Sequence, residues 1–177
     1  MTAVEFIHAE LHRLHKMLDA TISEITTEQL HTVPAGHPKA NTIAWGLFHC
    51  VRTEDNVVRF VLQDRRATVW TEGGYAGRLG LPPVAQGTGM STAEAQALHI
   101  KDVDLFRGYM QQVWASTEEL FTKADAGFFD KIVTIKPIGD MPAVQALGQV
   151  VLAHGTMHAG QMELARTLVG AKPVISV

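Results

Sequence analysis

Cysteine is nearly absent from this sequence, since Cys50 is the single copy among 177 residues. One cysteine excludes an internal disulfide and a cysteine-rich zinc finger, and it agrees with a reducing compartment. We interpret Cys50 as a small buried apolar residue.

A strong charge of one sign is also lacking. The chain has 15 Lys and Arg residues against 18 Asp and Glu residues, so its formal net charge is −3. Nucleic-acid-binding proteins usually concentrate basic side chains to neutralise phosphates, whereas the basic residues here are scattered. We therefore expect no nucleic-acid partner.

Long apolar runs are missing as well. Runs such as VVLA at 150–153 fall far short of the roughly 20 residues that a membrane-spanning helix needs. The N-terminal stretch contains Glu5 and Glu10, and it lacks the basic flank, apolar stretch and cleavage site of a signal peptide. We therefore expect no membrane partner and a cytoplasmic location.

The composition that remains is that of an ordinary globular protein, with 46% apolar and 19% charged residues. A chain of this length suits one compact domain, and we expect a single domain over residues 1–177. Histidine is the unusual residue, because the chain has nine copies.

Apolar residues recur at helical spacing in four stretches, which predict helices over residues 4–22, 42–62, 91–121 and 142–169. Cap signals support these limits. They are Asn41, the STAE capping box at 91–94, Asp140 with Pro142, and Gly170 followed by Pro173.

Two long connections separate these helices. Residues 64–90 are rich in glycine and contain a Pro-Pro pair, so they do not form a continuous helix. Residues 124–140 contain KIVTI, which could form a short extended piece, but no convincing sheet is predicted. The first connection is long enough to let the second and third helices lie parallel. We therefore predict an all-α fold, a four-helix bundle that is not simply up-down-up-down.

Two histidines stand four residues apart in the run VVLAHGTMHAGQMELAR. At helical spacing His154 and His158 share one face and project within about 60° of the apolar stripe. Each buried imidazole must satisfy two ring nitrogens, which a shared metal ion would do. Hydrogen bonds to neighbouring side chains are the alternative. The pair is not the H-E-x-x-H signature of zinc proteases, because no glutamate stands between the histidines.

A third histidine, His49, lies on the predicted second helix within NTIAWGLFHC. Catalytic divalent metals typically have three protein ligands and one open position, so His49 could complete the set. The adjacent Cys50 diverges by about 100° around the helix and is not expected to bind the same ion. Gln161, one turn beyond His158, could hydrogen-bond a ligand or simply pack.

The first predicted helix offers a competing cluster of three histidines. His8, His12 and His15 fall within about 60° of one another around that helix, and could also bind metal. They flank the apolar stripe, where surface or interface histidines are normal, and we interpret them in that way.

Three segments in this order, NTIAWGLFH, VWTEGGY and HGTMHAGQ, resemble the DinB-like (damage-inducible B) superfamily over nearly the whole chain. The resemblance implies a four-helix bundle with up-down-down-up topology, and a homodimer. It also implies a divalent metal, zinc or nickel, bound by His49, His154 and His158. The family name reflects damage-induced expression, a stress response.

Characterised relatives imply a reaction that uses a low-molecular-weight thiol. They include transferases that join mycothiol, bacillithiol or glutathione to an electrophile, and a maleylpyruvate isomerase. We therefore expect a metal-dependent S-transferase or isomerase whose partners are a small-molecule thiol and an electrophilic substrate. In this mechanism the metal lowers the pKa of the thiol.

Two other functions stay open. A metal-dependent hydrolase would need a general base, but Glu54 and Glu163 each lie about 140° around the helix from the nearest histidine of the set. A stress-associated metal-binding protein without catalysis would need no base. The central connection, with Trp70, Tyr75 and Arg78, could cover the site and contact substrate, or it could be a mobile spacer.

Overall fold

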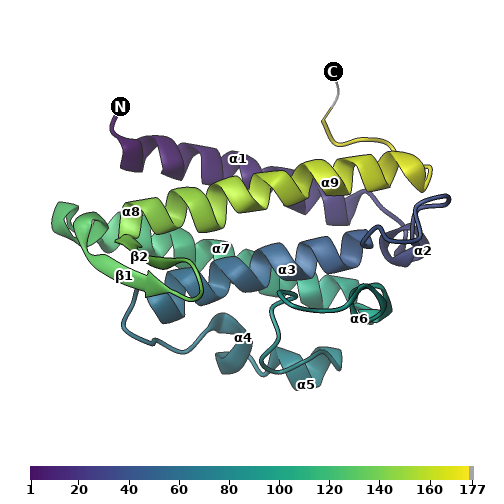
Figure 1. The fold of residues 1–177 in the computed structure, drawn as a ribbon, viewed down its shortest axis with the longest axis horizontal. Helices are drawn as coiled ribbons and strands as arrows, with labels where there is room; N and C mark the ends of the chain where they lie inside the picture. Colours follow the sequence, from purple (N-terminus) through teal and green to yellow (C-terminus); the bar gives the residue numbers. More distant parts are fainter. Residues whose placement is uncertain (176–177) are drawn as a thin grey trace.

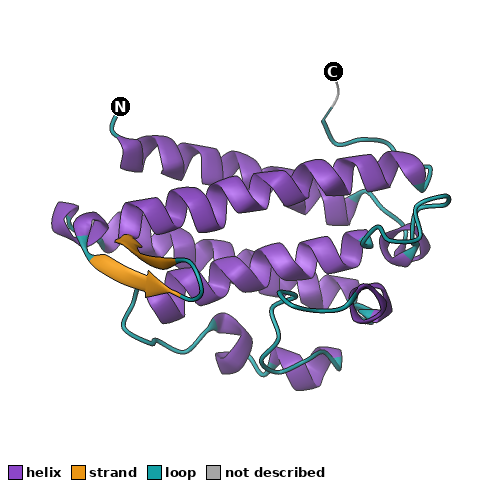
Figure 2. Ribbon diagram, in the orientation of Figure 1, coloured by secondary structure: helices purple, strands orange, loops and turns teal. Residues whose placement is uncertain are grey.

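The computed structural model describes residues 1–175, which are mostly helical (Figures 1 and 2). The long helices are α1 (Ala3–Ser23), α3 (Ile43–Asp55), α7 (Val103–Lys123) and α9 (His154–Leu168). The π-helical segment η1 (Asn56–Val61) extends α3, while α8 (Ala143–Ala146) and the π-helical η3 (Leu147–Ala153) lead into α9. The shorter elements are α2 (Thr27–His31), α4 (Val69–Glu72), α5 (Tyr75–Leu79), α6 (Thr92–Ala97), the 3₁₀ turn η2 (Ala126–Asp130), β1 (Ile132–Ile135) and β2 (Gly139–Pro142).

The long helices lie side by side. In Figure 1, α1 and α9 run from left to right, whereas α3 and α7 run from right to left. Helix α9 packs against α1 and α3, and α7 packs against the same two helices. The prediction of a mainly helical chain is confirmed. None of the helices within residues 1–175 is long and apolar enough to cross a membrane.

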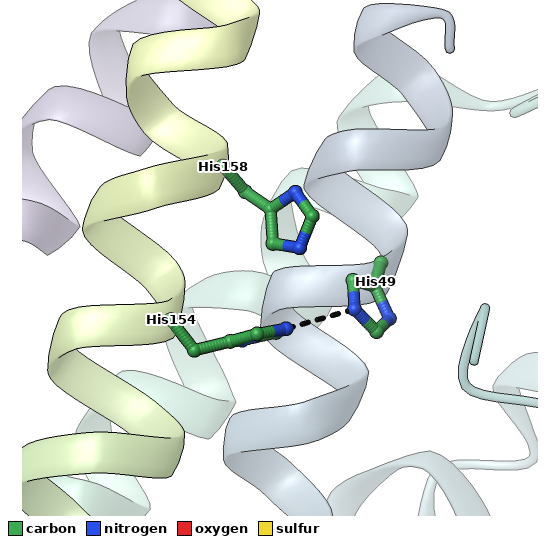
Figure 3. A group of neighbouring side chains, drawn as sticks. All are labelled: His49, His154 and His158. Atoms are coloured by element: carbon green, nitrogen blue, oxygen red, sulfur yellow. Dashed lines mark hydrogen bonds between the residues drawn. The ribbon is translucent and has the colours of Figure 1, made fainter.

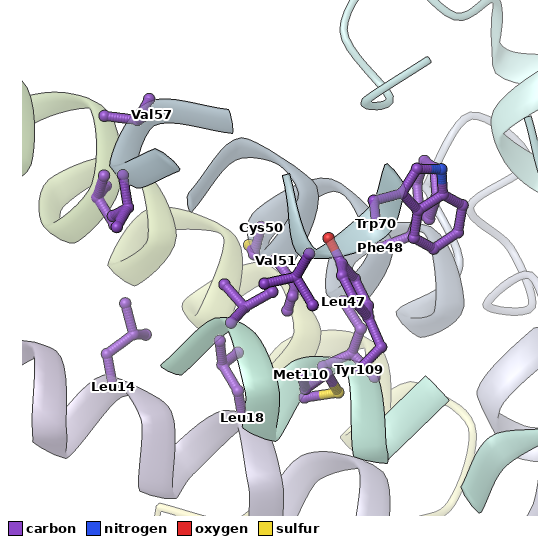
Figure 4. Packing of buried hydrophobic residues seen from close by; sticks show 14 of the residues in the cluster. Leu14, Leu18, Leu47, Phe48, Cys50, Val51, Val57, Trp70, Tyr109 and Met110 are labelled. Atoms are coloured by element: carbon purple, nitrogen blue, oxygen red, sulfur yellow. The ribbon is translucent and has the colours of Figure 1, made fainter. Parts of the chain in front are cut away.

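The core forms where the apolar faces of these helices meet. Leu11, Leu14 and Leu18 recur at spacings of three and four along α1 and are all buried. Figure 4 shows Leu14 and Leu18 together with Val51 of α3 and Met110 of α7 in this cluster. The helical spacing in the sequence therefore identified the buried faces correctly.

The helix predicted over 91–121 is interrupted, because α6 ends at Ala97 and α7 starts at Val103. The predicted capping box at Ser91 is present and begins α6. A second cap follows, since the Asp102 carboxylate accepts the Leu105 N–H at 2.8 Å. Between them the Ile100 N–H donates to His31 Nε2 at 2.9 Å. The break is therefore stabilised by a contact with α2, which helical spacing could not reveal.

Two predicted caps are wrong. The N-cap of α3 is Thr42, whose side chain accepts the Trp45 N–H, and not Asn41. Asp140 belongs to β2, where its carboxylate accepts a hydrogen bond from the Thr134 hydroxyl at 2.6 Å. Helix α8 begins at Ala143, one residue after the predicted start at 142, and Pro142 is its N-cap.

A small antiparallel hairpin is present where no convincing sheet was predicted. Strands β1 and β2 pair from Ile132 opposite Pro142 to Ile135 opposite Gly139. The extended piece predicted for KIVTI is β1, whose partner strand contains glycine and proline and lacks an apolar alternation. The hairpin lies at one end of the long helices (Figure 2), where Lys131, directly before β1, pairs with Asp64 at the start of the glycine-rich connection at 2.6 Å.

The glycine-rich connection is anchored by a buried carboxylate, Asp55, at the end of α3. This carboxylate accepts the backbone N–H groups of Val69 and Trp70, each at 2.9 Å, and the Tyr109 hydroxyl at 3.0 Å. Arg52 Nη1 lies 3.5 Å from it. Burial raises the pKa of Asp55 even though these hydrogen bonds favour the charged form. The start of α4 is thereby attached to α3 and α7.

Candidate metal centre

Three histidines from two helices point toward one another (Figure 3). His49 projects from α3, while His154 and His158 project from successive turns of α9. One ring nitrogen from each lies within 4.8 Å of the others, and Nε2 of His49 is 2.9 Å from Nε2 of His154. The structure therefore brings together the three histidines predicted as ligands.

Hydrogen bonds orient two of these rings. Nδ1 of His49 donates to the Gln86 carbonyl at 2.6 Å, and Nδ1 of His158 donates to the Gln161 side-chain oxygen at 2.8 Å. A proton on Nδ1 leaves a lone pair on Nε2, which is the tautomer that a metal ion binds. Gln161 therefore hydrogen-bonds His158, a predicted ligand. This is one of the two roles that the sequence suggested for it, the other being simple packing.

The electrostatics favour the neutral imidazole at His49 and His154. Burial, with a smaller effect of the neighbouring His49 and His158 rings, lowers the pKa of His154 to about 4. Burial is also the main cause that lowers the pKa of His49. Two Nε2 lone pairs at 2.9 Å repel each other unless a proton or a cation lies between them. The donor set of three imidazole nitrogens therefore fits a divalent transition metal.

A glycine lets the central connection reach the site. Gly87 has a φ of +94°, and a Cβ on it would lie 2.9 Å from Nδ1 of His49. Residues with a Cβ rarely adopt this conformation, and glycine leaves room for the imidazole. The roles of Gln86 and Gly87 were not predicted, because a backbone carbonyl has no residue-type signature and the stretch reads only as glycine-rich.

The aromatic residues of the connection do not reach the site. Trp70 and Tyr75 are buried against Tyr109 in the core, with ring centroids 5.0 Å from the Tyr109 ring in both cases. Arg78 lies over the Tyr75 ring at 5.0 Å. The backbone at Gln86, and not these three side chains, is the part of the connection that contacts the histidines.

Trp45 lies one turn before His49 and covers the cluster. Its ring stacks on the His49 ring with centroids 4.8 Å apart and meets the edge of His158 at 5.5 Å. The Trp45 side chain is buried, and its indole N–H has no hydrogen-bond partner among the described residues. It therefore shields one side of the cluster from water.

A pocket of about 380 Å³ opens beside the cluster between α3, α9 and the segment before α3. His158 and Gln161 line the pocket on the side of the three-histidine cluster, and Trp45 and Met162 supply apolar surface. Gly46 is part of the wall, and a Cβ there would lie 2.8 Å from Met162. The pocket has room for a small organic molecule next to the three imidazoles.

The candidate general bases are engaged elsewhere. Glu54 accepts hydrogen bonds from His15 and Thr117, and Glu163 accepts the backbone N–H groups of Val174 and Ile175. Cys50 is buried, as predicted, and burial raises the pKa of its thiol to about 12. Neither a carboxylate base nor a protein thiolate from these residues is available at the cluster.

The other three predicted histidines of α1 do not join this cluster. His8 and His12 contact Glu118 of α7, and His15 contacts Glu54 of α3. They lie at contacts between α1 and its neighbours, which agrees with their interpretation as residues at the edge of the apolar stripe.

The fold and the cluster define a mainly helical protein with three histidines gathered between two long helices. The chain belongs to the DinB superfamily, whose family model matches residues 10–162. The matched region includes all three histidines of the cluster.

A crystal structure of a conserved protein from Enterococcus faecalis has the same fold, with a TM-score of 0.80 at 18% sequence identity. The match covers 96% of this chain and 98% of that one. No curated protein matches the sequence.

Proposed function

We propose that this protein is a divalent-metal-dependent enzyme built as an up-down-down-up four-helix bundle. His49, His154 and His158 hold Zn²⁺ or Ni²⁺, and the reaction is the transfer or isomerisation of an electrophile by a low-molecular-weight thiol. The observation that carries the proposal is the convergence of three imidazoles, two of them oriented through Nδ1.

The metal would supply one chemical property, the lowering of the pKa of a thiol so that thiolate is present near neutral pH. The residues of the chain have other roles. Gln86 and Gln161 keep Nε2 of His49 and His158 free of protons. Trp45 excludes water from one side. In the transfer, the thiol S–H bond breaks and its proton passes to water, while the sulfur electron pair forms the new S–C bond as the leaving group of the electrophile departs with the electron pair of the broken bond. In the isomerisation, the thiolate adds to a C=C bond and is expelled again after rotation, so that the thiol is regenerated.

The pocket beside His158 suits the organic part of the thiol or the electrophile. Trp45, Met162 and Leu168 offer apolar contacts, and Lys39 brings positive charge to the same pocket. Glutathione and bacillithiol carry carboxylates that this charge would attract. A thiol also removes the need for a general base, which favours this reaction over water activation.

Metal analysis is the first test of this proposal. Untagged protein purified under metal-replete conditions is expected to contain Zn²⁺ or Ni²⁺, and His49→Ala and His158→Ala are each expected to lower the metal content. His99→Ala, at an exposed histidine of the α6–α7 link, is the matched control. A wild-type protein without stoichiometric metal would contradict the proposal.

The thiol is tested next, with cobalt in place of the native metal. Mycothiol, bacillithiol and glutathione are added in turn, and the absorption spectrum is followed for thiolate-to-cobalt charge transfer. We expect one of them to produce it. A metal-loaded protein that responds to none of the three contradicts the thiol reaction and favours hydrolysis or metal binding alone. The cytoplasmic location, the homodimer and the lack of nucleic-acid or membrane partners stay predictions from the sequence.

A further inference from the structure

A second group of metal-binding side chains lies between α1 and α7. Nε2 of His8 is 2.8 Å from Oε2 of Glu118, and Nε2 of His12 is 2.9 Å from the same oxygen. One ligand atom from each of the three lies within 4.8 Å of the others. These two histidines are four residues apart and so present their rings from successive turns of α1.

We propose that His8, His12 and Glu118 form a second divalent-metal site, for a first-row transition ion such as Zn²⁺. Two imidazoles and one carboxylate are a donor set that Zn²⁺ uses with an open position for water. The same set excludes Mg²⁺ and Ca²⁺ as preferred ions, because these take oxygen ligands. The site is separate from the three-histidine cluster and does not depend on its function.

The three side chains are already oriented without an ion. The His8 ring stacks on Phe121 of α7, with centroids 4.4 Å apart and planes inclined by 9°. The His8 and His12 ring centroids are 4.9 Å apart. Because packing restricts His8 before binding, less conformational entropy is lost when an ion binds.

The charge of Glu118 is available to an ion. Within residues 1–175 it contacts His8 and His12 but pairs with no Lys or Arg, whereas Arg66 and Lys123 pair with the adjacent Glu119. An uncompensated carboxylate next to two imidazoles attracts a cation more strongly than one already paired with Lys or Arg.

The site is open to solvent on one side. The side chains of His8, His12 and Glu118 are 32%, 52% and 45% exposed, so an ion and its water ligands can reach them. A cleft of about 360 Å³ adjoins His12 and Glu118, with Trp114 in its wall. His15, which also lines this cleft, is committed to Glu54 through Nε2. The cleft gives the remaining coordination positions access to water.

The test uses a full-length chain whose three-histidine cluster has been removed by His49→Ala and His154→Ala. Calorimetric titration of this metal-free background with Zn²⁺ is expected to show one bound ion per chain. Adding Glu118→Gln should weaken that binding by more than about tenfold, since loss of a ligand costs at least as much as loss of a supporting contact. Glu119→Gln, one residue away on the same helix, is the matched control and should leave the affinity unchanged.

The wild-type chain provides a second measurement that does not need the double variant to fold. In the wild-type chain, Glu118→Gln and His12→Ala should each remove one equivalent of bound Co²⁺. His49→Ala should remove a second equivalent, the one at the three-histidine cluster, which is recognised by its own absorption spectrum. No Zn²⁺ binding in a folded background chain overturns the proposal. The same holds if Glu118→Gln and Glu119→Gln bind equally well. Neither result alters the expectation for the three-histidine cluster.

Discussion

His154 differs from the other two histidines of the cluster because its Nδ1 has no hydrogen-bond partner among the described residues. Its ring is oriented by packing against His49 and His158, with centroids 4.7 Å and 4.6 Å away. Burial and these two neighbours both disfavour the imidazolium. The proton affinity of His154 is therefore lowered by its packed surroundings in the fold.

The lowered pKa of His154 predicts an acid-dependent loss of stability in metal-free protein. The unfolded chain takes up a proton near pH 6.5, whereas the folded chain resists it until about pH 4. Between these values the unfolded state binds more protons, so the free energy of unfolding falls as the pH falls from 6.5 to 4. Urea unfolding across this range measures the slope. His154→Gln is expected to flatten it, and an unchanged slope would contradict the assignment.

Replacement of Gly87 is expected to weaken metal binding at the three-histidine cluster. In Gly87→Ala the new methyl group meets the His49 ring at 2.9 Å and should displace it from the Gln86 carbonyl. We expect metal affinity to fall about tenfold or more, as for loss of other supporting contacts. Gly89→Ala is the matched control, because Gly89 also has a positive φ, +79°, but has no atom within 4 Å of the added Cβ. Equal affinities for the two variants would argue against the steric explanation.

Among the elements, α3 is buried along its whole length, since every residue from Ile43 to Asp55 is buried. Its His49 faces α9 and its Asp55 faces α4 and α7, so the same helix carries the site and anchors the connection that covers it. The π-helical segments η1 and η3 contact each other where α3 ends and α9 begins. Such segments are common beside functional sites.

Loss of the single carboxylate of Asp55 is expected to lower the free energy of unfolding strongly. Asp55→Ala leaves the N–H groups of Val69 and Trp70 unpaired and removes the carboxylate beside buried Arg52. We expect the free energy of unfolding to fall by about 3 kcal/mol, as when a buried ion pair loses one partner. Asp102→Ala, which removes the cap of α7, should cost only about 1 kcal/mol. Urea denaturation of both variants measures the difference, and equal losses would refute it.

Across the whole molecule, the cluster connects segments that are far apart in the chain. His49 and His154 are 105 residues apart, and their helices are held together by an apolar core as well as by the imidazoles. A bound ion would add a direct link between α3 and α9. Its binding free energy would then contribute to the stability of the folded state.

Metal removal is therefore expected to lower the melting temperature. At a free metal concentration of 100 times Kd, binding stabilises the folded state by about 2.7 kcal/mol, which a chelator should abolish. The comparison is made in Glu118→Gln, so that the second proposed site does not contribute. His49→Ala in that same background should melt at one temperature with and without chelator. A chelator shift that survives His49→Ala would place the ion elsewhere.

Local patterns predicted the long helices, because their apolar spacing depends only on neighbouring residues. The break before α7 and the hairpin partner of β1 were not predicted. The break before α7 is stabilised by the hydrogen bond from the Ile100 N–H to His31. The hairpin depends on β1 pairing with Gly139–Pro142, a segment that has no strand-like alternation. Both are contacts or pairings that intrinsic propensity does not encode.

The sequence alone determined which three histidines belong together, through their helical phase and the resemblance to the DinB superfamily. It could not determine what orients them. The Gln86 carbonyl and the space left by Gly87 reach His49 only when the connection folds back on α3. Glu118 likewise joins His8 and His12 only through the packing of α1 on α7. Helical spacing is a property of one segment, whereas these contacts require two segments to meet, and only the tertiary structure decides where they do.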